Sequence, residues 1–187
     1  MDRLIDWYPT LSNYYYFSDG FTAEECDKII NSFKDSEKED ATTFNNDNQY
    51  RKTKIKWIEP SDENKWIYEK LLDLTKIANK ELYRFHITSI YDFIQFSEYS
   101  SSFGGKYDKH IDVGDGNIHS CRKLSVILQL SDENQYEGGD VCIRDNPISK
   151  KQGTVTVFPS FLEHNVNKVT KGVRYSLVLW IYGPPFV

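Results

Sequence analysis

The sequence lacks the long apolar runs of a membrane protein. Its apolar stretches are short, as in VLWIY near the C-terminus, whereas a membrane-spanning helix needs about 20 such residues. The first residues, MDRLIDWYPT, show no cationic start followed by an apolar stretch, so we expect no secretory signal. Cysteine is scarce, and the spacing of Cys26, Cys121 and Cys142 follows no disulfide or metal pattern. We therefore expect reduced thiols and a cytoplasmic protein.

A surplus of basic charge is also missing. The 23 Lys and Arg residues are outnumbered by 28 Asp and Glu residues, which gives a formal net charge of −5. This balance argues against nucleic acid as a partner, because a nucleic-acid-binding face is normally basic. The chain has no internal repeats and no low-complexity linker. With 187 residues, of which 39% are hydrophobic, it is long enough for one packed domain, and we expect a single domain over residues 1–187.

The first part of the chain has the pattern of helices. Thr22 and Glu25 form a capping box before apolar residues at helical spacing. A second helix is expected to start near Ser61 or Asp62, with a broad apolar stripe that runs to Leu82. Both stripes are typical of helices that cover a sheet. Residues 1–85 are therefore predicted to be a helical support region.

After Tyr83 the apolar period changes to that of strands. Short strands with no helix between them predict antiparallel pairing in a sandwich or barrel. We therefore predict an α+β fold in which residues 86–187 form a jelly-roll-like core and the N-terminal helices pack against it. The expected strands are Ile90–Tyr99, Lys106–Asp112, Arg122–Leu130, Asp140–Arg144, Thr154–Phe158 and Val173–Tyr182.

Two candidate metal ligands, His110 and Asp112, lie in the segment GGKYDKHIDVG. On a strand their side chains project from the same face, because alternate residues do so. A third ligand must come from another strand, and His164, after the strand ending in VFPS, is the candidate. Two imidazoles and a carboxylate make a facial triad that leaves positions open on an octahedral Fe(II). Zinc accepts the same ligands tetrahedrally, so the ligand set alone leaves iron and zinc open.

A candidate anion site lies downstream in GVRYSLVLWIYG. Arg174 and Ser176 share a strand face with Val178 and Trp180. An arginine on the inner face of a barrel is costly unless it meets an anion, and its planar fork suits a carboxylate. The alternative is that Arg174 pairs with an acid of the chain itself. Together with the triad, a dicarboxylate that chelates the metal at one end and pairs with Arg174 at the other fits both features.

These motifs resemble a known family. The chain looks like a 2-oxoglutarate- and Fe(II)-dependent dioxygenase of the prolyl 4-hydroxylase-like branch, and the likeness covers nearly the whole chain. The resemblance implies a double-stranded β-helix (jelly-roll) core. The matching pieces are Tyr99, GGKYDKHID, RKLSVILQLSD, YEGGD, GTVTVFPSFLEH and VTKGVRYSLVLWIYGPPF.

The resemblance also implies roles for individual residues. The metal ligands would be His110, Asp112 and His164, and Arg174 with Ser176 would bind the distal carboxylate of 2-oxoglutarate. Tyr99 would lie near the cosubstrate, and on the predicted strand Gln129 and Ser125 face the same cavity. Tyr107 is either a pocket wall or a packing residue. The implied cofactors are Fe(II), 2-oxoglutarate and O₂, together with ascorbate.

The implied reaction hydroxylates a carbon centre and releases succinate and CO₂. A peptidyl residue such as proline is the first expectation for the substrate, and a free amino acid or other small metabolite is the second. Nucleic-acid demethylases carry a second arginine where this chain has Trp180. A catalytically silent metal- or ligand-binding barrel is the alternative from a different class. The loop 113–121 is interpreted either as a mobile substrate flap or as an ordinary hairpin connection.

Overall fold

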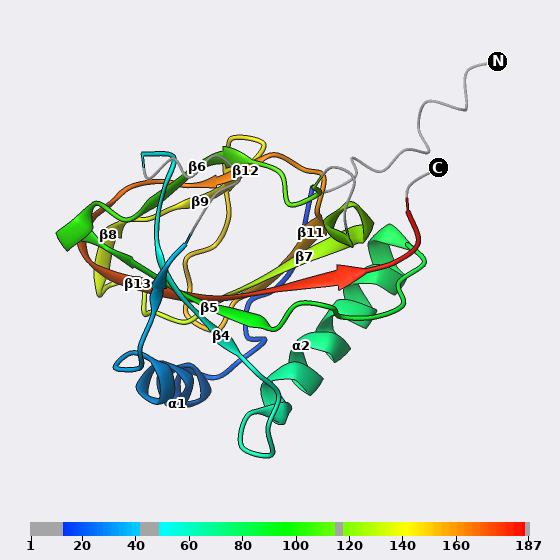
Figure 1. Ribbon diagram of the computed structural model, residues 1–187, viewed down its shortest axis with the longest axis horizontal. Helices are drawn as coiled ribbons and strands as arrows, with labels where there is room; N and C mark the ends of the chain where they lie inside the picture. Colours follow the sequence, from blue (N-terminus) through cyan, green and yellow to red (C-terminus); the bar gives the residue numbers. More distant parts are fainter. Residues whose placement is uncertain (1–12, 42–48, 115–117, 186–187) are drawn as a thin grey trace.

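Two β-sheets form the body of the protein in the computed structural model, which describes residues 13–41, 49–114 and 118–185 (Figure 1). The larger sheet has eight strands. Seven of them lie in the order β1-β11-β7-β13-β5-β4-β2, and the eighth, β8, pairs with β13. Its strands are β1 (Tyr15–Phe17), β2 (Glu39–Asp40), β4 (Lys54–Ile58), β5 (Ile94–Ser100), β7 (Arg122–Gln129), β8 (Tyr136–Gly138), β11 (Val155–Pro159) and β13 (Val169–Tyr182).

The smaller sheet faces the central strands of the larger one. Its order is β10-β9-β12-β6-β3, and all of its pairs are antiparallel. The two sheets enclose a second apolar cluster that includes Tyr99, Ile127 and Phe158. The strands of the smaller sheet are β3 (Arg51–Lys52), β6 (Lys106–His110), β9 (Val141–Ile143), β10 (Asn146–Pro147) and β12 (His164–Val166).

Two helices pack against the larger sheet on the side away from the smaller one, as Figure 1 shows. Helix α1 (Ala23–Phe33) begins after the predicted capping box, because the Thr22 hydroxyl accepts from the Glu25 N–H and the Glu25 carboxylate accepts from the Thr22 N–H. Helix α2 (Lys65–Ala78) continues as a short π-helix over Asn79–Tyr83. Two 3₁₀ turns, Ser101–Phe103 and Ile118–Cys121, complete the helical elements of the described ranges.

The main hydrophobic core lies between these helices and the larger sheet. Strand alternation produces it: Leu124, Val126 and Leu128 of β7 are buried in this core, as predicted, whereas Ser125 and Gln129 project to the other side. The expected α+β class with a double-stranded β-helix is therefore confirmed. None of the helices in the described ranges has the length and apolar character that crossing a membrane requires.

Some elements differ from the sequence pattern. The second helix begins at Lys65 rather than at Ser61 or Asp62, because residues 61–64 form a turn in which the Ser61 N–H donates to the Asn64 side chain. Residues 1–85 also supply strands β1 to β4, which pair with both sheets and were not predicted. Their apolar alternation is too short or too irregular to stand out before the pairing partners are known. The proposed flap or hairpin at 113–121 falls partly on residues 115–117, outside the described ranges.

Candidate active site

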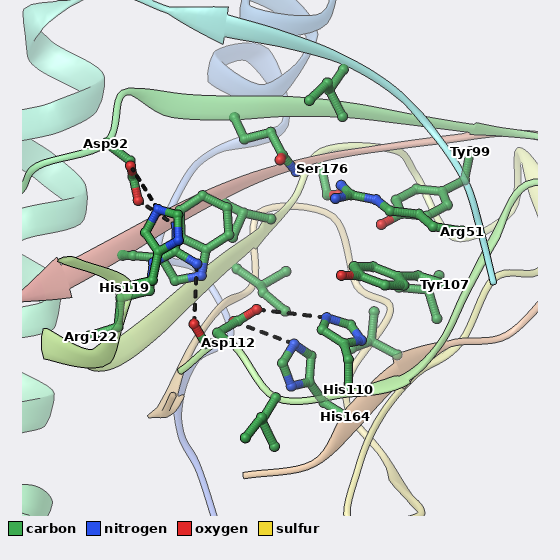
Figure 2. A pocket seen from close by; sticks show the side chains of 18 of the residues that line it. Arg51, Asp92, Tyr99, Tyr107, His110, Asp112, His119, Arg122, His164 and Ser176 are labelled. Atoms are coloured by element: carbon green, nitrogen blue, oxygen red, sulfur yellow. Dashed lines mark hydrogen bonds and ion pairs between the residues drawn. The ribbon is translucent and has the colours of Figure 1, made fainter. Parts of the chain in front are cut away.

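The structure brings the three predicted metal ligands together at one end of a cavity of about 770 Å³ between the sheets (Figure 2). One potential ligand atom from each of His110, Asp112 and His164 lies within 4.8 Å of the others. His110 ends β6 and lies directly opposite His164, the first residue of β12. His164 was expected at a turn after the preceding strand, and it instead starts a strand of its own.

Hydrogen bonds orient both imidazoles. The Nδ1 atom of His110 lies 2.8 Å from the carbonyl oxygen of Asp108, and that of His164 lies 2.9 Å from the carbonyl oxygen of Leu162. A carbonyl can only accept, so both Nδ1 atoms carry a proton, and in the neutral imidazoles it is Nε2 that keeps the lone pair. The two Nε2 atoms point at Asp112, at 3.7 Å from Oδ1 for His110 and 3.4 Å from Oδ2 for His164. This arrangement is typical of histidines that ligate a metal.

Burial and neighbouring groups shift the pKa values of His110 and Asp112 toward the protonation states that a cation requires. Burial lowers the pKa of His110 to about 4, so its imidazole is neutral at pH 7. Burial alone would raise the pKa of Asp112, but the two histidines and a hydrogen bond from Ser125 outweigh it and lower that pKa to about 2. The Ser125 hydroxyl donates to Asp112 Oδ2 over 2.6 Å. The site therefore offers two imidazole nitrogens and one carboxylate, which fits Fe(II) and also fits zinc.

The backbone of Asp112 is held as firmly as its side chain. Its N–H donates to the carbonyl oxygen of Ser160 over 2.9 Å, and its carbonyl oxygen accepts from Arg122 Nη1 over 3.2 Å. Arg122 also forms an ion pair of 2.5 Å with Asp92 and lies over the ring of Trp180. These contacts fix the segment that follows β6, so that the carboxylate faces the histidines.

Arg174 lies in the same cavity and is 1% exposed. Its Nε and Nη2 atoms donate to Gln129 Oε1 over 3.1 and 2.7 Å, and its Nη1 atom donates to Ser176 Oγ over 3.3 Å. Within the described ranges it forms no ion pair, so the alternative of an internal acid is not found there. The neighbouring Gln129 Nε2 atom is also buried without a hydrogen-bond partner. A buried guanidinium with only neutral partners is suited to an external carboxylate.

The other predicted residues lie close to these two centres. Tyr99 lines the cavity, and its ring centroid lies 5.3 Å from the Arg174 guanidinium carbon. The ring of Tyr107 stacks on His110 with centroids 3.5 Å apart, so Tyr107 both packs and forms part of the wall. Gln129 reaches Arg174 directly. Its part in binding a cosubstrate stays a prediction.

Three residues of the cavity were not singled out from the sequence. Arg51 comes from β3, and Asp92 and Arg122 form the ion pair beside Asp112. Simple alternation places Arg122 on the core side of its strand with Leu124. A register shift between Ile181 and Tyr182 in the partner strand marks an irregularity at this end of the pair, where Arg122 lines the cavity. No local signal indicates Arg51, because its position depends on the pairing of β3 with β6.

Comparisons with known proteins agree with this geometry. Residues 94–182 match the 2OG-Fe(II) oxygenase superfamily. A PKHD-type hydroxylase of Synechococcus sp. (strain CC9311) is 42% identical over 82 residues, which cover 41% of this chain and 36% of that protein. A PKHD-type hydroxylase of Pseudomonas aeruginosa (strain LESB58) is 35% identical over 86 residues, which cover 41% of this chain and 38% of that protein. The matched segment thus spans well under half the length of these relatives.

Solved structures show the same fold. A Pseudomonas putida prolyl-4-hydroxylase has a TM-score of 0.72 at 19% identity, covering 92% of this chain and 93% of that one. A Trichoplax adhaerens prolyl hydroxylase, solved with a peptide fragment of hypoxia inducible factor, has a TM-score of 0.72 at 19% identity, covering 91% of this chain and 83% of that one. The sequence match to the 2OG-Fe(II) oxygenase superfamily is limited to residues 94–182, and the solved structures share the fold of nearly the whole chain. The resemblance to its prolyl 4-hydroxylase-like branch is confirmed.

Proposed function

We propose that this protein is a 2-oxoglutarate- and Fe(II)-dependent dioxygenase that hydroxylates a carbon centre. The observation that carries the proposal is the presence, in one cavity, of the inward-facing triad and a buried arginine with no acidic partner among the described residues. When bound, Fe(II), 2-oxoglutarate and O₂ supply the oxidising chemistry, in which 2-oxoglutarate becomes succinate and CO₂. The superfamily favours iron over the zinc that the same ligands accept. Ascorbate stays a prediction.

The residues of the chain have separate tasks in this reaction. His110, Asp112 and His164 would hold the metal. Ser125 orients the Asp112 carboxylate by donating to Oδ2, which leaves Oδ1 for the ion. Arg174 and Ser176 would bind the distal carboxylate of the cosubstrate, since the guanidinium offers a planar pair of donors. The apolar side chains of Ile127 and Val178 line the same cavity and exclude water around the metal and the cosubstrate.

The substrate is proposed to be a peptidyl residue such as proline. This choice is supported by the prolyl hydroxylases among the structural neighbours, one of which was solved with a peptide. A free amino acid or other small metabolite is the second candidate, and nucleic acid stays disfavoured by the acidic balance of the chain. A cytoplasmic location is proposed from the three free cysteines, of which Cys26 and Cys142 are buried.

The first test is an anaerobic titration of the metal-free protein with Fe(II) and then with 2-oxoglutarate, followed by visible absorption. A charge-transfer band that requires both additions would support the proposal. Asp112→Ala and His164→Ala should lose Fe(II) binding and succinate production, whereas Arg174→Ala should bind Fe(II) and require far more 2-oxoglutarate. Asp108→Ala is the matched control, because its carboxylate lies on β6, four residues before Asp112, and pairs with Lys106 instead.

Two results would contradict the proposal. If Fe(II) binds but no band forms with 2-oxoglutarate, the carboxylate site at Arg174 is wrong. If no metal binds, the triad is structural and the silent barrel becomes the better interpretation. Incubation of the loaded protein with proline-containing peptides, followed by mass spectrometry for a gained oxygen atom, then tests the substrate class.

A further inference from the structure

A third arginine of the cavity, Arg51, has no part in the function proposed above. It lies on β3, where it pairs in register with Tyr107 of β6. Its guanidinium carbon lies 4.4 Å from the centroid of the Tyr107 ring, and that ring lies 3.5 Å from the ring of His110 with planes only 14° apart. Figure 2 shows the guanidinium, the phenol ring and the imidazole stacked in a column that ends at the triad.

Among the described residues, the guanidinium of Arg51 has no polar partner. Its Nε atom is buried and has no hydrogen-bond partner, and no ion pair joins Arg51 to an acid of the described ranges. The other two arginines of the cavity differ in this respect, since Arg122 pairs with Asp92 and Arg174 donates to Gln129 and Ser176. A partly buried cation without a partner costs free energy that a bound anion would recover.

We propose that Arg51 binds a carboxylate of the substrate, so that this enzyme acts on molecules that carry a free carboxylate near the carbon to be hydroxylated. The inference rests on the proposed function and narrows its substrate class to a residue with a free carboxylate, as at the C-terminus of a peptide or in a free amino acid, rather than a residue within a peptide chain. The planar guanidinium fork matches a carboxylate through two parallel hydrogen bonds. The Tyr107 ring separates the fork from His110, so the bound carboxylate lies one ring layer beyond the metal ligands and is not a metal ligand itself.

Two other anions fit this position less well. The distal carboxylate of the cosubstrate is directed to Arg174, which lies beside Tyr99 rather than Tyr107. A phosphate group carries nearly two negative charges, and the acidic side chains of Glu39 and Asp40 line the same cavity and repel it more strongly than a carboxylate. A single carboxylate is therefore the group that the charges of this cavity favour.

The test uses pairs of probes that differ only in this group. N-acetyl-L-proline and a series of other N-acetylated amino acids, each as the free acid and as the amide, are titrated by calorimetry into the anaerobic protein loaded with Fe(II) and 2-oxoglutarate. For the acids that bind, we expect at least about tenfold tighter binding than for their amides, as a charge-assisted contact provides. Arg51→Gln should reduce this preference to about twofold or less, and Arg51→Lys should keep part of it.

The matched control is Lys52→Gln, which removes the same charge from the next residue of β3. Lys52 is exposed and does not line the cavity, so the preference should be unchanged. The charge-transfer band is recorded for every variant, and we expect it in all of them, since Arg51 binds neither the metal nor the cosubstrate.

Several outcomes would overturn the inference. The native protein could bind every acid no more tightly than its amide. The preference for the acid could survive in Arg51→Gln. The charge-transfer band could also be lost in Arg51→Gln, which would make Arg51 part of the cosubstrate site. If the band is absent from the native protein, the proposed function itself fails. That result is distinguishable, because it precedes any addition of a probe.

Discussion

The buried charge of Arg174 predicts that the protein becomes more stable when this residue and its main partner are replaced by apolar ones. The double variant Arg174→Met, Gln129→Leu removes both members of the hydrogen-bonded pair, so neither is left unsatisfied. Removal of one member alone would leave a buried polar group without a partner, at a cost of about 1–3 kcal/mol. The two side chains are 1% exposed each, so water compensates little for the charge.

The magnitude follows from opposing terms. A buried ion carries a desolvation penalty of several kcal/mol, and each hydrogen bond from it returns about 1.5–3 kcal/mol. Gln129 Oε1 accepts both bonds of the pair, and the third bond, to Ser176, is long at 3.3 Å. These hydrogen bonds therefore return less free energy than the desolvation of the guanidinium costs. We expect the free energy of unfolding of the double variant to exceed that of the native protein by about 2 kcal/mol in the absence of cosubstrate.

Addition of 2-oxoglutarate should make the native protein more stable than the double variant. At 100 times its dissociation constant a ligand stabilises the native state by about 2.7 kcal/mol, and only the protein with Arg174 should show this gain. Urea unfolding followed by circular dichroism, with anaerobic Fe(II) in every sample, measures both free energies. Gln95→Leu is the control: Gln95 is also buried in the cavity wall but donates to Ser97, so its replacement should leave the effect of 2-oxoglutarate intact.

The reasoning is refuted if the double variant unfolds at lower urea concentration than the native protein without 2-oxoglutarate. In that case the charge of Arg174 is already compensated. Equal stabilisation of both proteins by 2-oxoglutarate would show that the cosubstrate does not use Arg174.

Two further predictions concern other contacts. Arg122→Gln should lower the free energy of unfolding by about 2 kcal/mol and weaken Fe(II) binding about tenfold, because Arg122 contacts both Asp92 and the Asp112 carbonyl oxygen. An unchanged Fe(II) titration would limit Arg122 to a structural role. Burial opposes ionisation of Glu25, but Lys70 and the Thr22 N–H lower its pKa, so its stabilising contribution is present at pH 7 and is lost as the pH falls through that lowered pKa. Glu25→Gln should therefore cost up to about 1 kcal/mol at pH 7 and less at pH 3 in urea unfolding, and an equal cost at both pH values would contradict this.

The parts of the site that could be predicted are those set by strand alternation. His110, Arg174, Ser176 and Gln129 lie on strands whose period of two is visible in the sequence. The structure places the first three at the cavity and Gln129 in hydrogen-bond contact with Arg174. The side on which each projects depends only on counting residues along its own strand.

The residues that escaped prediction depend on long-range pairing. Arg51 belongs to a two-residue strand with no period to detect, and it reaches the cavity only because β3 pairs with β6. Arg122 was hidden by the irregular end of its strand pair. The start of α2 was placed too early because the turn at 61–64 carries residues that also serve as helix caps.

Strand β7 has a consequence for the length of the molecule that the cavity accepts. Ser125 near one end of it holds the Asp112 carboxylate, and Gln129 at the other end holds Arg174, so the two are four residues, or about 13 Å, apart along one strand. Neighbours β11 and β13 clamp this strand on both sides. The separation between the metal ligand and the carboxylate anchor is therefore a property of the backbone. We therefore expect a keto diacid one carbon longer or shorter than 2-oxoglutarate to bind more weakly, because both anchors are held by the same strand.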